Sequence, residues 1–289
     1  MTACAGEEVG RTAAWGDMPV PPLDRLTMDR EKALRYGVDP LVREGWTTLV
    51  GVLGEPQALR FALETGLVWL RPDVVAAGSA RGLIERIAGS GFVPVGACVV
   101  RVDRGGVRAL WWWQFKRATA ERLLLLDAVA TLGPGLLVLY RHAEGDSARR
   151  LTRLKGGNDP SARSVDSLRS VAGSPNRLLT MVHTSDDPVD VVRELAVFLP
   201  WRERAALVAS ASASHPDSSS CLVAPLAVVE AAYRGCLEAS AEDRWVPQQR
   251  GEAFAALVRA IGVPQLPQRW AAVQDWSRRV PLLNDGSAG

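Results

Sequence analysis

The feature that most constrains the fold of this chain is an alternation of two apolar patterns between residues 66 and 199. Short apolar runs, typical of buried strands, alternate there with segments whose apolar residues recur at helical spacing. The expected strands cover residues 67–70, 92–102, 136–140 and 178–182, and the expected helices cover 80–88, 111–130, 147–154 and 188–199. This β-α-β-α-β-α-β-α order, with short connections, predicts a ferredoxin-like α/β fold in which an antiparallel sheet is backed by helices.

The alternation divides the chain into an N-terminal extension (1–65), an α/β domain (66–199) and an all-helical C-terminal region (200–289). In the extension we expect a loose tail over 1–22, a short helix over 29–36, a strand or buried apolar segment over 46–53 and a helix over 55–64. Within the α/β domain, polar and Gly residues at 103–106 predict a turn. The C-terminal region has helical spacing over 202–210, 222–238, 251–261 and 267–278, with a polar linker at 211–220.

The composition excludes several classes of function. With 47% hydrophobic residues the 289-residue chain can form a large core, and its 34 basic and 32 acidic residues leave a net charge of only +2. We therefore expect neither nucleic acid nor a membrane surface as a partner. The four cysteines, Cys4, Cys98, Cys221 and Cys236, show neither metal-ligand spacing nor a disulfide pattern. Without a signal peptide or an apolar run long enough to span a bilayer, the sequence predicts a soluble, cytoplasmic protein.

One short stretch, residues 180–189, carries the strongest sign of chemistry. Two apolar residues lead into His183, four polar residues follow, and Pro188 then opens a segment with the spacing of an amphipathic helix. Unpaired N–H groups and the positive dipole end make a helix N-terminus favourable for anions. A histidine beside an anion can accept a phosphoryl group. From this stretch alone, His183 could equally be a core histidine at the end of a strand.

Six short motifs follow one another along residues 66–199. They are residues 69–73 (WLRPD), 82–87 (GLIERI) with Gly91 and Phe92, 133–134 (GP) before an apolar run, 156–160 (GGNDP), 167–169 (SLR) and 183–186 (HTSD) with Glu194 eleven residues after His183. In this order and spacing they resemble the nucleoside diphosphate kinase family, over a little under half of the chain. The long stretch 156–175 is similar to the family's loop over the phosphates, and loops of this length are often functional.

The resemblance implies a phosphotransferase that moves the γ-phosphoryl group of ATP through a phosphohistidine. The acceptor would be a nucleoside diphosphate or a related small molecule. His183 matches the family's nucleophile, and Glu194 matches the glutamate that orients the imidazole through its other ring nitrogen. Ser185 matches a serine near that glutamate.

The resemblance also implies how the phosphates would be held. Arg169 matches an arginine that clamps them, where a bidentate guanidinium suits oxyanions. A second arginine is expected on the helix before the loop, and both Arg150 and Arg153 are candidates for it. Mg²⁺ would be carried with the nucleotide, held mainly by phosphates and water, with Asp186 the nearby candidate for a water-mediated contact.

The sequence departs from the family at residues expected to bind the nucleotide. Arg71 stands in place of a lysine in the first strand motif, and a planar arginine fork differs from a compact lysine charge. Asn158 stands in place of a threonine of the loop, and Thr180 in place of an asparagine that contacts the ribose in the family. We keep Arg71, Asn158 and Thr180 as predicted nucleotide and phosphate ligands with altered contacts.

The departures and the terminal regions leave a second hypothesis open. The extension over 1–65 and the helices over 200–289 could cover the cleft or block the homo-oligomer that the family usually forms. The chain would then be a nucleotide-binding module with lost or altered phosphotransfer, acting as a sensor or scaffold or in a different reaction on a nucleotide.

Several residues also have a purely structural interpretation. Glu194 could be an ordinary exposed helix residue, Arg169 a solvated loop charge and Arg150 part of a charged surface. His142 has no partner motif and is expected to be structural, and His215 is expected to be a solvated loop residue.

The aromatic cluster at residues 111–113, with Phe115, has two interpretations as well. It lies where the family's helical hairpin provides a platform for the base, and a base can stack on such rings. Packing in the core or against the additional helices is the alternative.

Overall fold

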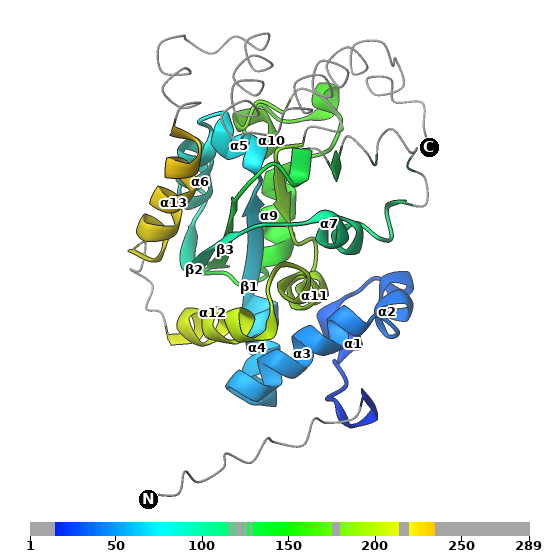
Figure 1. Ribbon diagram of the computed structural model, residues 1–289. Helices are drawn as coiled ribbons and strands as arrows, with labels where there is room; N and C mark the ends of the chain where they lie inside the picture. Colours follow the sequence, from blue (N-terminus) through cyan, green and yellow to red (C-terminus); the bar gives the residue numbers. More distant parts are fainter. Residues whose placement is uncertain are drawn as a thin grey trace, which may run out of the picture.

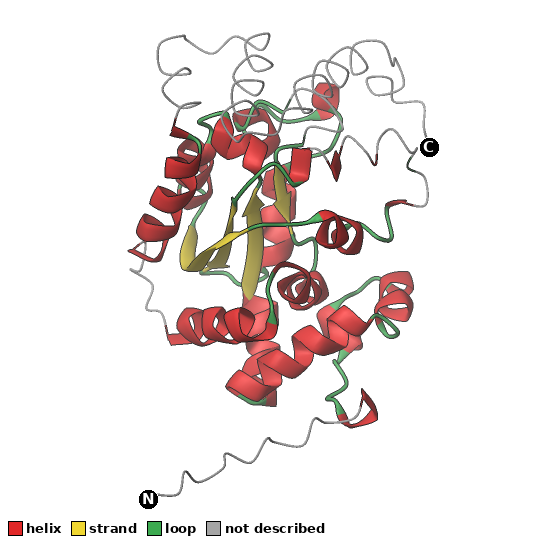
Figure 2. Ribbon diagram, viewed as in Figure 1, coloured by secondary structure: helices red, strands yellow, loops and turns green. Residues whose placement is uncertain are grey.

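The computed structural model describes residues 15–115, 118, 123, 126–127, 129–174, 180–213 and 220–234 (Figures 1 and 2). Within these ranges four strands form one sheet, namely β1 (Thr65–Leu70), β2 (Phe92–Val100), β3 (Gly135–His142) and β4 (Val182–Thr184). Their order is β2-β3-β1-β4, and every neighbouring pair is antiparallel. This is the strand order of a ferredoxin-like fold, so the predicted fold class is confirmed.

Helices cover both faces of the sheet (Figure 1). The helices that follow β1 and β3, α6 (Ala80–Ala88) and α9 (Ser147–Lys155), lie on one face with α5 (Pro72–Ala76), α10 (Leu168–Val171) and α13 (Ser220–Ala232). The opposite layer contains α3 (Pro40–Leu53), α4 (Glu55–Glu64), α7 (Arg104–Leu110), α11 (Pro188–Phe198) and α12 (Trp201–Ala213). Shorter elements are η1 (Trp15–Asp17), α1 (Leu23–Leu26), α2 (Arg30–Tyr36) and η3 (Pro160–Ala162).

The continuous apolar run of β1 follows from burial on both faces. Side chains alternate across a strand. Leu67 and Trp69 therefore enter the core shared with α3, α11 and α12, while Val68 and Leu70 enter the core shared with α6 and α13. A strand buried on both faces needs no alternation of polar and apolar residues, which is why its sequence shows none.

The N-terminal helices share a core with the sheet. α3 packs along α11, and Trp46 and Leu49 are fully buried in the same hydrophobic cluster as β1. Gly45 of α3 comes so close to α11 that a Cβ atom there would lie 2.0 Å from the backbone oxygen of Val192. This close approach places the N-terminal extension directly against the helix that carries Glu194.

Of the two alternatives expected over 46–53, the strand is wrong, whereas Trp46 and Leu49 are buried as an apolar segment would be. These residues form the second half of α3. Trp46, Leu49 and Leu53 recur at helical spacing, and burial of that face outweighs the β-propensity of the Thr and Val residues between them.

The turn expected over 103–106 is also wrong, because these residues begin α7. Asp103 caps the helix, since its Oδ1 accepts a hydrogen bond from the backbone N–H of Gly106 at 2.7 Å. The cap offsets the low helix propensity of Gly105 and Gly106.

The other described elements lie close to their predicted positions. The helices expected over 29–36, 55–64, 80–88, 147–154 and 188–199 are α2, α4, α6, α9 and α11. β2 ends two residues before its predicted end, and α12 extends into the predicted linker as far as Ala213. The strand expected over 178–182 is displaced, because β4 shares only Val182 with that range and residues 180 and 181 are not in a strand, so His183 lies inside β4.

Several predictions concern segments outside the described residues. They are the tail over 1–14, much of the helix over 111–130, residues 175–179, residues 214–219 with His215, and the helices expected beyond 234. Cys4 and Cys236 also lie there, whereas Cys98 and Cys221 are free thiols. Within the described ranges, none of the helices has the length and hydropathy needed to cross a membrane.

Candidate active site

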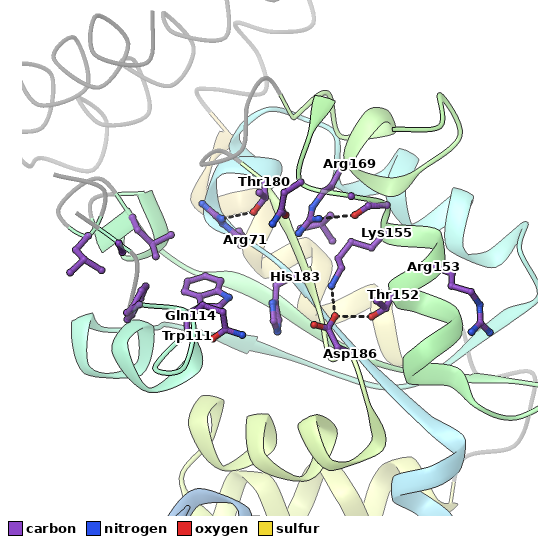
Figure 3. A pocket seen from close by; sticks show the side chains of 18 residues that line it. Arg71, Trp111, Gln114, Thr152, Arg153, Lys155, Arg169, Thr180, His183 and Asp186 are labelled. Atoms are coloured by element: carbon purple, nitrogen blue, oxygen red, sulfur yellow. Dashed lines mark hydrogen bonds and ion pairs between the residues drawn. The ribbon is translucent and has the colours of Figure 1, made fainter. Parts of the chain in front are cut away.

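A cleft of about 800 Å³ opens where β1 ends and β4 begins. The C-terminal end of α9, the first residues of the following loop and the segment after α7 complete its walls (Figure 3). Six of the predicted site residues line this cleft, namely Arg71, Arg153, Asn158, Arg169, Thr180 and His183. Segments separated by more than a hundred residues in the chain therefore meet at one place.

His183 presents its imidazole to the cleft from β4, with the side chain 13% exposed. Its Nε2 lies 2.9 Å from Oε1 of Glu194, and Ser185 Oγ donates a hydrogen bond to Oε2 of Glu194 at 2.5 Å. Glu194 is buried behind the ring. Both of its oxygens are engaged, as a buried carboxylate requires.

The contact with Glu194 decides which nitrogen of His183 is free. A carboxylate can only accept a hydrogen bond, so Nε2 carries the proton and Nδ1 of the neutral ring holds the lone pair. Among the described residues Nδ1 has no hydrogen-bond partner. The Trp111 ring meets the imidazole edge-on, with centroids 5.8 Å apart and planes at 85°. An imidazole that is hydrogen-bonded through one nitrogen and has a free lone pair on the other has the geometry of a nucleophile.

Arg71 follows β1 and is fully buried at the cleft. Its guanidinium donates to Asp73 Oδ2 at 3.1 Å and to Thr180 Oγ1 at 3.2 Å (Figure 3). Burial raises the pKa of the Asp73 carboxyl, and the charge of Arg71 opposes that rise. The buried Nε of Arg71 has no hydrogen-bond partner among the described residues. The guanidinium therefore has one unsatisfied N–H donor at the wall of the cleft.

Arg169 lies on α10, and its Nη1 donates to the backbone oxygen of Gly156 at 2.7 Å. Burial, together with the like charges of Arg163 and Arg71, lowers the pKa of Arg169 to about 10, against the opposing effect of Asp186. Repulsion between cations in a poorly solvated place is relieved by a bound anion. The cleft thus favours a ligand with negative charge.

Lys155 is a further cation in the cleft, and no sequence motif indicates it. Its Nζ lies 2.7 Å from Asp186 Oδ1 and donates to the backbone oxygen of Thr184 at 3.3 Å. Thr152 Oγ1 donates to the same Asp186 oxygen at 2.9 Å. Burial raises the pKa of Asp186, but the Lys155 pair, His183 and Thr152 outweigh it and lower that pKa to about 2.

The signal that could have revealed Lys155 is its place on the buried face of α9. Ala148, Leu151 and Lys155 are three and four residues apart, and all three are buried. Residues at this spacing share one helix face. A lysine on the apolar face of a helix, directly before a glycine-rich loop, is therefore a candidate ligand for an anion.

The structure separates the two arginines that the sequence left as alternatives. Arg150 donates to the backbone oxygen of Gly145 at 3.1 Å and pairs with Glu144, outside the cleft. Arg153 contributes to the cleft rim, but its side chain is 66% exposed and extends from α9 on the side away from His183 (Figure 3). Neither lies beside the imidazole, where Lys155 is found instead.

Part of the lining of the cleft is apolar. Trp111, Phe115, Leu123 and Leu126 contribute this part. Trp111 also packs against the core residue Trp69, with 6.1 Å between ring centroids, whereas the stacking of a base on this segment stays a prediction.

The described residues offer no cage for a metal ion, since no group of three His, Cys, Asp or Glu side chains is suitably arranged. Asp186 is the one carboxylate among the described lining residues, and Lys155 already engages one of its oxygens. Among the described lining residues, Asp186 would therefore be the contact for Mg²⁺ carried on a bound polyphosphate.

No protein-family model matches this chain, and no curated protein matches its sequence. Among solved structures, it is similar to the nucleoside diphosphate kinase of Aquifex aeolicus, with 18% identity and a TM-score of 0.41 over 47% of this chain and 94% of that one. The Encephalitozoon cuniculi enzyme gives 15% identity and a TM-score of 0.41, over 47% of this chain and 88% of that one. The Halobacterium salinarum enzyme, solved in complex with CDP, gives 18% identity and a TM-score of 0.38, over 50% of this chain and 98% of that one.

These neighbours all cover about half of this chain. Their identities are low, so the activity has to be inferred from the geometry of the site.

Proposed function

We propose that this protein is a phosphotransferase that moves the γ-phosphoryl group of ATP through a phosphohistidine at His183 to a nucleoside diphosphate or a related small acceptor. The observation that carries the proposal is the 2.9 Å contact between His183 Nε2 and Glu194, with Nδ1 left to the cleft. The cleft is lined both by the aromatic side chains Trp111 and Phe115 and by cations. A nucleoside triphosphate has the matching groups, a base and a polyphosphate.

In the first half-reaction, the Nδ1 lone pair of His183 attacks the γ-phosphorus in line with the oxygen that bridges to the β-phosphate. An N–P bond forms, the P–O bond breaks, and its electron pair leaves with ADP. The Nε2 proton stays between the ring and Glu194, whose charge stabilises the positive charge that develops on the imidazole. In the second half-reaction, a terminal phosphate oxygen of the acceptor attacks the same phosphorus, and the N–P bond breaks to restore the neutral ring.

The buried cations of the cleft would hold the phosphates during both steps. Arg71, Lys155 and Arg169 line the same cavity as His183. Charge-assisted hydrogen bonds from such groups stabilise the charge on the transferring phosphoryl group. Mg²⁺ bound to the nucleotide would neutralise part of the phosphate charge.

One observation favours a second function, nucleotide binding without phosphotransfer. Arg71 is fully buried and already bound to Asp73 and Thr180, so its guanidinium has little freedom to follow a moving phosphoryl group. A chain that binds ATP in this state but does not transfer phosphate would act as a sensor or scaffold.

The test is incubation with ATP that carries a radioactive γ-phosphate, followed by an alkaline quench, because phosphohistidine survives alkali and is lost in acid. We expect acid-labile label that His183→Ala abolishes and that a nucleoside diphosphate chase removes. His142→Ala is the matched control. Its imidazole accepts a hydrogen bond from the backbone N–H of Glu144 and packs on Phe92, outside the cleft, so it should label as wild type does.

The outcomes separate the two functions. Absence of label on a wild-type protein that still binds ATP would reject phosphotransfer and support the binding module. Label that persists in His183→Ala would reject His183 as the nucleophile. Label that no nucleoside diphosphate can discharge would point to a dedicated acceptor.

A further inference from the structure

Arg193, the residue next to Glu194 on α11, connects the N-terminal helices to a wall of the cleft. Its side chain is buried. Its Nε donates to Asp39 Oδ2 at 2.6 Å, and its Nη2 donates to the backbone oxygen of Ala109 at 2.6 Å. Its Nη1 makes a longer contact of 3.4 Å with the backbone oxygen of Leu110. One guanidinium therefore joins α11, the start of α3 and the end of α7.

The N-terminal helices hold this guanidinium from two directions. Asp39 is the N-cap of α3, where its Oδ1 accepts a hydrogen bond from the backbone N–H of Leu41 at 2.9 Å, so its Oδ2 has a fixed place. Tyr36 covers the face of the guanidinium, with Cζ of Arg193 at 5.5 Å from the ring centroid. The Tyr36 hydroxyl is itself anchored, donating to Asp190 Oδ1 on α11 at 2.6 Å. Hydrogen bonds thus restrain the Arg193 guanidinium within its own plane, and the Tyr36 ring restrains it from one side of that plane.

At its other end, Arg193 fixes the last turn of α7. Ala109 and Leu110 end that helix, where the negative end of the helix dipole makes a cation favourable, and the Ala109 oxygen also accepts a backbone hydrogen bond from Trp112 at 3.4 Å. The next residue is Trp111, whose ring meets the imidazole of His183 edge-on. The position of the helix end therefore determines where the Trp111 ring lies against His183.

We infer that Asp39 and Arg193 are positioning residues of this site. They hold the end of α7 so that Trp111 fixes the imidazole of His183 at the cleft. The N-terminal helices are then a working part of the site rather than an attached extension. The inference rests on the proposed function for its catalytic consequence, whereas the position of the ring can be measured without any nucleotide.

The experiment uses the small number of histidines. The full chain contains three, so a protein with isotope-labelled histidine rings gives three Cε1–Hε1 signals, each assigned with its own His→Gln variant. Because an aromatic ring shifts the resonances of nearby protons, the His183 signal reports the place of Trp111. We expect Asp39→Asn to move this signal toward its position in Trp111→Leu and to leave the His142 signal unchanged.

Two further variants make the result specific. Glu44→Gln also breaks an ion pair between α3 and the body of the protein, the 2.7 Å contact with Arg204 on α12, but this contact does not involve α7. It should leave the His183 signal in place. In the Trp111→Leu background, Asp39→Asn should cause no additional shift of the His183 signal, because residues that act through one another are not additive.

Arg193→Lys covers the case in which Asp39→Asn does not fold. A lysine keeps the charge but lacks the planar fork in which one nitrogen reaches Asp39 and another reaches Ala109, so we expect the same shift. A folded Arg193→Lys or Asp39→Asn protein whose His183 signal stays at the wild-type position would overturn the inference. An equal shift in the Trp111→Leu background would overturn it as well.

The catalytic consequence is measured separately. We expect Asp39→Asn to slow phosphohistidine formation at saturating ATP about tenfold, as a small misplacement of a reacting group does. A wild-type protein that never labels would reject the proposed function, while the NMR signals would still decide whether Asp39 and Arg193 position the ring.

Discussion

Glu194 Oε1 lies 2.9 Å from Nε2 of His183, although Glu194 is the eleventh residue after His183 in the chain. α11 begins four residues after β4 ends, and its second turn therefore returns over the strand. Ser185, in the short connection, donates to the other oxygen of the same carboxylate. A short connection between a strand and a helix thus builds the contact that would activate the imidazole.

Glu194→Gln should slow phosphohistidine formation roughly 100-fold or more, a loss in the range of acid–base and electrostatic contributions. A neutral amide stabilises the positive charge on the ring less than a carboxylate does, while ATP affinity should stay close to wild type. Rapid-quench labelling and calorimetry measure the two quantities. Ser185→Ala removes only one hydrogen bond and should cost about tenfold. An unchanged rate in Glu194→Gln would remove Glu194 from the mechanism.

Lys155→Met should change how stability depends on pH. Burial raises the pKa of Asp186, but the pair with Lys155 helps to lower it to about 2 in the folded protein. A carboxyl with such a lowered pKa stabilises the folded protein at pH values above its ordinary pKa of about 4. This stabilisation is lost as the pH falls from about 4 toward 2. The difference in unfolding free energy between wild type and Lys155→Met should shrink over that window in urea titrations. A difference that does not vary with pH would contradict the ion pair.

Arg71→Met should destabilise the protein by about 3 kcal/mol, because it leaves Asp73 buried without its partner. In the double variant with Asp73→Asn, most of the unfolding free energy should return. ATP affinity should not return if Arg71 binds phosphate. Urea denaturation and calorimetry on the same set of proteins measure both. Recovery of ATP affinity in the double variant would make Arg71 purely structural.

Gly45→Ala should destabilise the protein by about 1–3 kcal/mol, because the added Cβ would meet the backbone oxygen of Val192 on α11. Gly51 lies on the same helix, and apart from that helix no atom of the described residues comes within 4 Å of the place that a Cβ would take. Gly51→Ala should therefore stabilise the protein by about 0.5–1 kcal/mol through helix propensity. Equal effects of the two variants on urea unfolding would contradict the close packing of α3 on α11.

The sequence predicts the elements that follow strong local patterns. The fold class could be predicted because apolar strands alternate with helices of clear period along residues 66–199, and β1 and β3 are apolar on both faces. Spacing alone favours an ordinary exposed helix residue for Glu194, and the family resemblance is what places it beside His183, where the structure has it. Their roles in catalysis stay predictions until they are measured.

What the sequence could not provide depends on tertiary contacts. Residues 46–53 have the β-branched content of a strand and become helical because α11 buries their apolar face. Spacing could not choose between Arg150 and Arg153, since a shift of one residue on a helix turns a side chain by about 100°. The bridge from Asp39 through Arg193 to Ala109 joins three distant segments and has no local signature.

The most direct test of the account is to determine which ring nitrogen carries the phosphoryl group after a short incubation with ATP. Phosphorus NMR of the denatured phosphoprotein at alkaline pH distinguishes the two isomers of phosphohistidine. Because Nε2 faces Glu194, we predict a phosphoryl group on Nδ1 of His183 and on no other residue. Phosphate on Nε2, or on a different side chain, would contradict the account.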